Sequence, residues 1–128
     1  MHINEAAIKA ALGVMDRHLV ALNALNAHAL VKTLHFPHYR LVGPKLDCWE
    51  TQDTYLADFR ERAGDKWACT QWASIDIQKD SADKVHLAVR INRFDVDDGL
   101  IADFESLWVI TLKNNKWAAQ FRSSFAAL

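Results

Sequence analysis

Leu34-His35-Phe36-Pro37-His38-Tyr39-Arg40-Leu41-Val42-Gly43 is the stretch that decides the fold. A helical pattern precedes it and a series of strand patterns follows it. Pro37 cannot donate a backbone hydrogen bond and biases Phe36 toward extended geometry, so we expect the helix to stop just before the proline. The stretch also holds two of the six histidines. It is therefore the first place to look for a functional group.

The composition is that of one ordinary globular domain spanning residues 1–128. The chain is 51% hydrophobic and 24% charged, which supplies enough apolar mass for a core. A net charge of −1 with both signs interspersed argues against a nucleic-acid partner. No apolar run approaches the roughly 20 residues that span a bilayer, and no signal peptide is visible. We expect a cytoplasmic protein without a membrane anchor, with Cys48 and Cys69 as reduced core thiols.

The N-terminal part predicts two helices between Ile3 and about Leu34. Apolar residues recur there at helical spacing and predict a buried stripe made of Ile8, Leu12, Met15, Leu19 and Leu22. Asn23 and Asn26 interrupt the stripe, and asparagine favours helix ends. We therefore expect a break and a second helix from Leu25 to Leu34.

A short hairpin and a third helix follow the proline. Tyr39–Val42 and Leu46–Trp49 read as two strands joined by a turn at Gly43-Pro44. Asp53 is placed to cap a helix from Thr54 to Ala63, and Gly64 stands where a helix-ending glycine is common.

Four long strands complete the chain. Their expected ranges are 67–79, 85–92, about 100–113 and 117–125, and Val85 to Asn92 shows the alternation of a half-buried strand. Asn114-Asn115 can supply the positive φ angles of a tight hairpin. The acidic loop from Asp95 to Gly99 lacks the ligand spacing of an EF-hand, so we interpret it as a hairpin turn. The whole order predicts an α+β fold.

This order of elements resembles the nuclear transport factor 2-like superfamily, which includes SnoaL-like polyketide cyclases, ketosteroid isomerase, scytalone dehydratase and limonene epoxide hydrolase. The resemblance covers nearly the whole chain and rests on the architecture, on Thr33-Leu34-His35-Phe36-Pro37-His38 and on the closing segment 116–124. It implies a cone-shaped fold, in which about three N-terminal helices pack on a curved, mostly antiparallel sheet of about six strands. Because such folds carry isomerases, dehydratases, cyclases, hydrolases and non-catalytic adaptors, the resemblance implies no single reaction.

Strand alternation divides the sheet into an inner face toward the cavity and an outer face. The expected inner set is Gln71, Ile75, Ile77, Val85, Leu87, Val89, Ile91, Phe104, Ser106, Trp108, Ile110, Trp117, Ala119 and Phe121. The expected outer set is Trp72, Asp76, His86, Arg90, Glu105, Leu107 and Arg122. β-Bulges would shift such assignments by one residue. The mixed outer set is compatible with the isologous interface of a homodimer.

His38 and His35 are the candidate acid–base residues, since imidazole exchanges protons near neutral pH. In isomerase-like members of the superfamily a carboxylate general base follows the second helix, and this chain offers these two histidines there instead. The candidate ligand-binding residues are Tyr39, Tyr55, Gln71, Ser106, Trp108 and Trp117. The competing interpretation makes the histidines helix-end and partly exposed groups and most tryptophans packing residues, with Asp16 and His18 at a solvated helix edge. No metal or cofactor motif is present in the sequence.

Two functions remain open from the sequence. The first is binding of a small hydrophobic molecule in the cone, with cofactor-free isomerase, cyclase or dehydratase chemistry at His38 or His35. The alternative is a non-catalytic dimerisation or ligand-sensing module, which the scarcity of carboxylates on the expected inner face favours.

Overall fold

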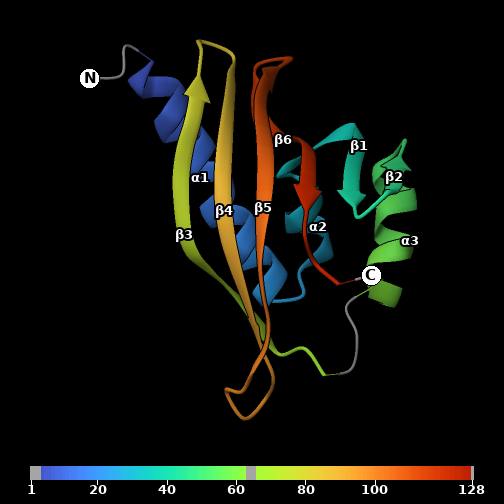
Figure 1. Cartoon of the computed structure of the whole chain (residues 1–128). Helices are drawn as coiled ribbons and strands as arrows, with labels where there is room; N and C mark the ends of the chain where they lie inside the picture. The colour runs from blue at the N-terminus through green and yellow to red at the C-terminus, as the bar shows by residue number, and fades with distance from the viewer. Residues whose placement is uncertain (1–3, 63–65, 128) are drawn as a thin grey trace.

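The structure is a computed structural model that describes residues 4–62 and 66–127. In those residues the chain forms two helices, a hairpin, a third helix and four long strands (Figure 1). The elements are α1 (Glu5–Asn23), α2 (Ala27–Val31), β1 (Leu34–Val42), β2 (Lys45–Trp49), α3 (Gln52–Arg62), β3 (Cys69–Asp80), β4 (Lys84–Phe94), β5 (Leu100–Lys113) and β6 (Lys116–Ser124). They make one six-stranded sheet in the order β2-β1-β6-β5-β4-β3. Only the β1–β6 pair is parallel, so the predicted α+β plan with a mostly antiparallel sheet is confirmed.

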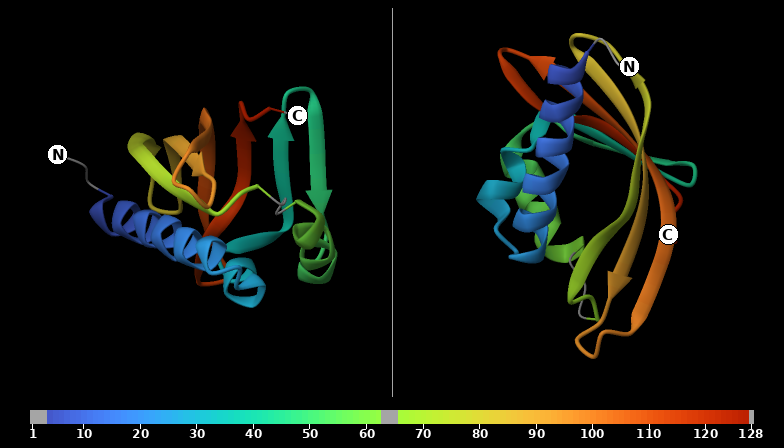
Figure 2. Two further views of the ribbon diagram at one scale, coloured as in Figure 1. Left: turned by 90° about the horizontal axis from the view of Figure 1, so that it is seen from below. Right: turned by 90° about the vertical axis from the view of Figure 1, so that its left-hand side faces the viewer.

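Helix α1 crosses the concave side of the curved sheet (Figure 2). Its buried residues are Ala7, Ala11, Val14, Met15, His18 and Ala21. The expected stripe is therefore rotated by about one position, because small alanines let the helix approach the strands closely while Leu12 and Leu22 flank the contact. The expectation of a solvated edge holds for Asp16 but is wrong for His18, which is only 2% exposed.

The second helix is shorter than expected, and the strand after it begins earlier. Helix α2 ends at Val31, and β1 already starts at Leu34 and runs through Pro37. A proline fits inside this strand because the pairing of β1 with β6 shifts register between Leu34 and Tyr39, so its missing N–H disrupts no regular ladder.

The turns lie where the sequence predicted them. Gly43 has a φ of 55° between β1 and β2, and Asn114 and Asn115 have φ angles of 53° and 60° between β5 and β6. In the β4–β5 turn, Asp95 Oδ1 accepts hydrogen bonds from the backbone N–H groups of Asp97 (2.9 Å) and Gly99 (2.8 Å). The acidic loop is thus a hairpin turn organised by one carboxylate.

Helix α3 begins two residues earlier than expected, and Asp53 is not its cap. Thr51 Oγ1 accepts a hydrogen bond from the Thr54 N–H at 3.3 Å, which is the geometry of an N-terminal capping residue. The predicted end of the helix at Ala63-Gly64 lies outside the described residues.

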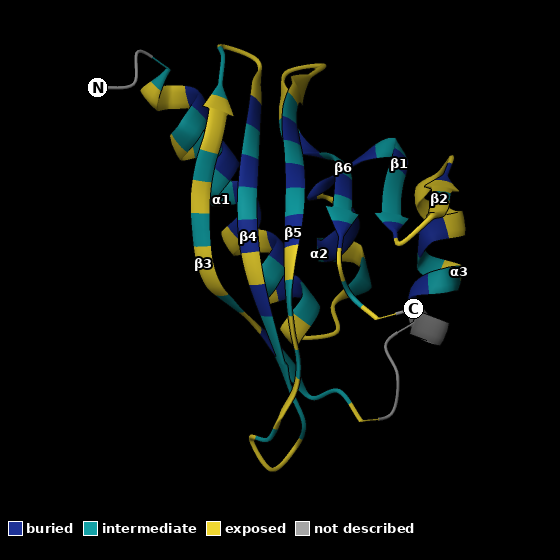
Figure 3. Cartoon of the chain, in the orientation of Figure 1, coloured by how far each residue is buried: buried dark blue, intermediate teal, exposed yellow. Residues whose placement is uncertain are grey.

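Two register shifts change which side chains face inward. The pairing of β3 with β4 shifts between Trp72 and Ser74, and that of β5 with β6 shifts between Val109 and Ile110. An extra residue in one strand reverses the alternation beyond it. The assignments of Gln71 and Phe121 to the inner face, and of Trp72 and Arg122 to the outer face, are therefore wrong. Within β4 and most of β5 the alternation is regular, and the predicted inner residues are buried apart from Phe104, which is partly buried (Figure 3).

The two cysteines are both free thiols. Cys48 is exposed, so the expectation that it is a core thiol is wrong. Across residues 4–62 and 66–127, no helix has the length and apolar character needed to cross a membrane.

Candidate functional site

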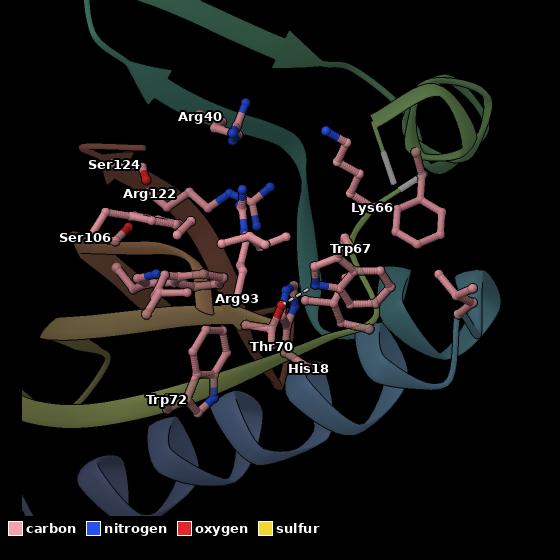
Figure 4. A pocket seen from close by; sticks show the side chains of 18 of the residues that line it. His18, Arg40, Lys66, Trp67, Thr70, Trp72, Arg93, Ser106, Arg122 and Ser124 are labelled. Carbon is pink, nitrogen blue, oxygen red and sulfur yellow. Dashed lines mark hydrogen bonds between the residues drawn. The ribbon is translucent and has the colours of Figure 1, made fainter. Parts of the chain in front are cut away.

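A pocket of about 420 Å³ lies between α1, α3 and the concave face of the sheet (Figure 4). Six of its described lining residues are aromatic, namely Tyr55, Phe59, Trp67, Trp72, Phe104 and Trp108. Volumes of several hundred Å³ with an apolar lining and a few polar groups are typical of small-molecule sites. The pocket is thus of a size and character to hold a small organic molecule.

Trp72 and Trp108 form one wall together with His18. The ring centroids of His18 and Trp108 are 5.0 Å apart in an edge-on arrangement, and those of Trp72 and Trp108 are 5.7 Å apart. Trp72 Nε1 donates a hydrogen bond to the Met15 carbonyl at 3.0 Å, which ties β3 to α1. Ring packing among α1, β3 and β5, together with the Trp72 hydrogen bond, holds this wall in place.

The orientation of His18 is set by Thr33. Thr33 Oγ1 donates its only hydrogen to the Leu30 carbonyl at 2.7 Å, so toward His18 Nδ1, 2.8 Å away, this hydroxyl acts as the acceptor. His18 therefore carries a proton on Nδ1, and in the neutral ring the lone pair is on Nε2. A histidine held in this tautomer beside a pocket has the form of a general base or a hydrogen-bond acceptor for a ligand.

The sequence analysis does not identify His18 as a site residue, because the expected leucine stripe leaves His18 at the solvated edge of the helix. A signal for it was present: His18 is four residues after Val14 and seven after Ala11, which is the spacing of one helical face. The alanine line of the helix, rather than its leucines, marks the side that meets the sheet.

Cationic side chains also line the pocket. Arg40, Arg93, Arg122 and Lys66 belong to the described lining, and this lining contains no carboxylate. The Arg122 guanidinium carbon is 5.1 Å from the centroid of the Trp108 ring, and that of Arg93 is 4.7 Å from the Phe104 centroid. The pocket is therefore more polar on this side than the predicted, mostly apolar cavity.

Three of the predicted ligand-binding residues come together in the pocket. Tyr55, Ser106 and Trp108 line it and are buried. Trp117 packs against the core outside the lining, Gln71 is exposed, and Tyr39 pairs with the outward-facing Phe121. Their roles as ligand-binding residues stay predictions that these positions do not support.

The two predicted acid–base histidines lie outside the described lining. His38 is 0% exposed, donates from Nδ1 to the Ala119 carbonyl at 3.1 Å and stacks near Trp49. His35 donates from Nε2 to the Thr111 carbonyl at 3.0 Å. Across the described residues, no group of histidine, cysteine and acidic side chains is arranged to hold a metal ion.

Acidification is expected to destabilise the protein through His35. Burial, with added repulsion from Lys116 and Lys113, holds the pKa of His35 below its ordinary value, although the Thr111 carbonyl opposes this. Below about pH 6.5 the unfolded chain therefore binds a proton that the folded chain does not, and stability falls as the pH decreases.

Urea unfolding of the wild type and His35→Gln between pH 7.5 and pH 5.5 measures this effect. In His35→Gln the free energy of unfolding should fall less between pH 7.5 and pH 5.5 than in the wild type. The control His28→Gln, at an exposed position, should show the same fall as the wild type. An equal dependence of the free energy of unfolding on pH in all three proteins would contradict the expectation.

Comparison with solved structures shows what this fold is similar to. An NTF2-like protein of unknown function from Pseudomonas putida KT2440 matches with a TM-score of 0.80 at 10% identity, covering 99% of this chain and 91% of that one. An NTF2-like protein from Cytophaga hutchinsonii matches with a TM-score of 0.71 at 18% identity, covering 99% and 100%. A ketosteroid isomerase-like protein from Erwinia carotovora atroseptica matches with a TM-score of 0.66 at 12% identity, covering 94% and 95%.

No protein-family model and no curated protein sequence matches the chain. At these identities the structural likeness establishes the fold and leaves the reaction open. The chain has the nuclear transport factor 2-like fold, which confirms the resemblance seen in its sequence.

Proposed function

We propose that this protein binds a small, largely aromatic or apolar molecule in the pocket between α1, α3 and the sheet. The observation that carries the proposal is a pocket of about 420 Å³ with aromatic rings on several elements around it. Offset or edge-on contacts with such rings favour a flat, hydrophobic ligand body. Ser106, Tyr55 and His18 line the same space and can orient the ligand by hydrogen bonds.

A thermal-shift screen against steroids, polyketide-like aromatics and terpenoids tests this proposal. A ligand that binds only the folded state raises the melting temperature with its concentration, and the pocket tryptophans should report the same binding by fluorescence. Ala102→Phe narrows the pocket, because Ala102 lines it, and should weaken binding. Ala82→Phe, at an exposed position in the β3–β4 turn, is the matched control. Binding that is unchanged in Ala102→Phe would contradict this site.

Cofactor-free acid–base chemistry is the second candidate function, and the Thr33–His18 pair favours it. The sequence pointed to His38 and His35, but the pocket brings His18 to the ligand side instead. In this proposal the Nε2 atom of His18 exchanges a proton with the bound molecule, as in isomerase, cyclase or dehydratase steps, and Thr33 is a positioning residue. Loss of turnover in His18→Gln, with ligand affinity retained, would support this chemistry.

The alternative is a ligand-sensing or dimerisation module without a reaction. The absence of carboxylates from the described lining supports it, because carboxylates are common general bases. Ligand binding without turnover in any tested class would favour this module. The cytoplasmic location expected from the sequence stays a prediction.

We also propose that the outer face of the sheet pairs two copies of the chain. Ala88, Leu107, Val109 and Phe121 are neighbours on that face by strand register and are half-buried in the single chain. An apolar strip on an otherwise polar face fits an isologous contact.

Light scattering during size-exclusion chromatography measures this dimer. Leu107→Asp should yield monomers, because an isologous contact buries the new carboxylate in both copies. Glu105→Gln, on the same strand at an exposed position, should remain dimeric. A monomeric wild type would contradict the proposal.

A further inference from the structure

Three arginines from three different strands line the same pocket. Arg40 is on β1, Arg93 on β4 and Arg122 on β6, and their side chains are directed into one space (Figure 4). Arg40 and Arg122 are direct register partners in the parallel β1–β6 pair. The described lining of the pocket therefore holds three guanidinium groups.

The positions of these guanidinium groups are supported by the pocket walls. Arg122 is only 9% exposed and lies over the Trp108 ring, while Arg93 lies over the Phe104 ring. Arg40 Nη1 is 3.7 Å from Asp47 Oδ2. A guanidinium that rests on an aromatic ring is held by cation–π attraction, and its N–H donors lie in its own plane. Such a group is oriented before any ligand arrives.

Guanidinium groups that line a pocket attract an anionic ligand. Charges interact several times more strongly near a protein surface than in bulk water. A carboxylate also matches the planar fork of a guanidinium with two parallel hydrogen bonds. The aromatic remainder of the pocket then suits the apolar body of the same molecule.

We propose that the pocket selects an aromatic carboxylate, with its ring against the tryptophan wall and its carboxylate held by Arg122 and Arg93. The inference rests on the proposed function, because it names the chemical class of the ligand for that same pocket. Arg122 and Arg93 are then specificity-determining residues of the site.

Matched naphthalene probes test the proposal by calorimetry and tryptophan fluorescence on the full chain at pH 7.5. 2-Naphthoate, 2-naphthamide and 2-naphthyl phosphate share one ring system and differ in the polar group. A hydrogen bond to a charged group contributes enough that 2-naphthoate should bind roughly tenfold to hundredfold more tightly than the amide. Arg122→Gln and Arg93→Gln should each reduce this preference, and the second variant covers the case in which the first fails to fold.

Arg90→Gln is the matched control. Arg90 lies on β4 like Arg93 but is exposed and pairs with Asp103 at 2.8 Å. The variant should keep the wild-type preference for 2-naphthoate.

Each outcome decides between the two proposals. Equal binding of 2-naphthoate and 2-naphthamide would overturn the anion inference and leave small-molecule binding intact. Tighter binding of the phosphate than of the carboxylate would overturn the carboxylate assignment. A carboxylate preference that Arg122→Gln and Arg93→Gln both retain would overturn the role of the arginines. If no naphthalene probe binds, the inference is overturned, and the wider ligand screen then decides the proposed function.

Discussion

Tyr55→Ala is expected to lower the free energy of unfolding by about 3–5 kcal/mol, the range found when buried aromatic side chains are truncated. Tyr55 is 2% exposed and is the centre of an aromatic cluster. Its ring centroid is 5.1 Å from that of Trp49, and 6.1 Å from those of Phe36 and His38. Truncation removes the contacts that join α3 to β1 and β2 and leaves a cavity beside the pocket.

Tyr55→Phe separates the ring from the hydroxyl group. It retains the aromatic packing and should therefore be much less destabilising than Tyr55→Ala. Urea unfolding followed by tryptophan fluorescence measures both variants. If Tyr55→Phe is as destabilising as Tyr55→Ala, the hydroxyl rather than the aromatic packing holds this region together. Ligand binding by Tyr55→Phe also tests the predicted role of the hydroxyl in the site.

Leu87→Ala is expected to cost about 2–5 kcal/mol, because a leucine is removed from a site that cannot collapse around the cavity. Leu87 is 0% exposed on β4 and pairs in register with Trp108. Neighbouring strands on both sides keep the backbone in place, so little relaxation is available. This loss is a large share of the roughly 5–15 kcal/mol that stabilises a typical domain.

Leu100→Ala is the matched control for this prediction. Leu100 begins the next strand, β5, but is 56% exposed. Its removal should change stability by no more than about 0.5 kcal/mol, as at most surface positions. A Leu87→Ala variant as stable as Leu100→Ala would show that the inner face of β4 is not the core of the domain.

The lining residues on β5 that the sequence predicted lie where the strand alternation is uninterrupted. Ser106 and Trp108 follow the regular pattern of β5 and do line the pocket. Gln71 was expected beside them, but a register shift in β3 brings Trp72 inward in its place. A bulge depends on pairing with a partner strand, and such pairing leaves no periodic mark in the sequence of either strand.

The functional groups that sequence reasoning missed depend on long-range contacts. Arg40 and Arg122 become neighbours only through the parallel pairing of β1 with β6. Arg122 faces the pocket only because the β5–β6 shift reverses the alternation of β6. His18 is buried because α1 turns its alanine line to the sheet. The two arginine relations are not expressed in local residue spacing, whereas the burial of His18 has a local signal in the alanine line of α1.

The sequence by itself determined the order of the elements, the turns between strands and the α+β class. These features follow from local physics, since Gly43 and the Asn114-Asn115 pair tolerate positive φ angles and strand alternation repeats every two residues. Only the tertiary structure decided the chemistry of the pocket. The helix orientation and the two register shifts are set by packing between distant segments, and they selected His18 and the arginines rather than His38 and His35 to line it.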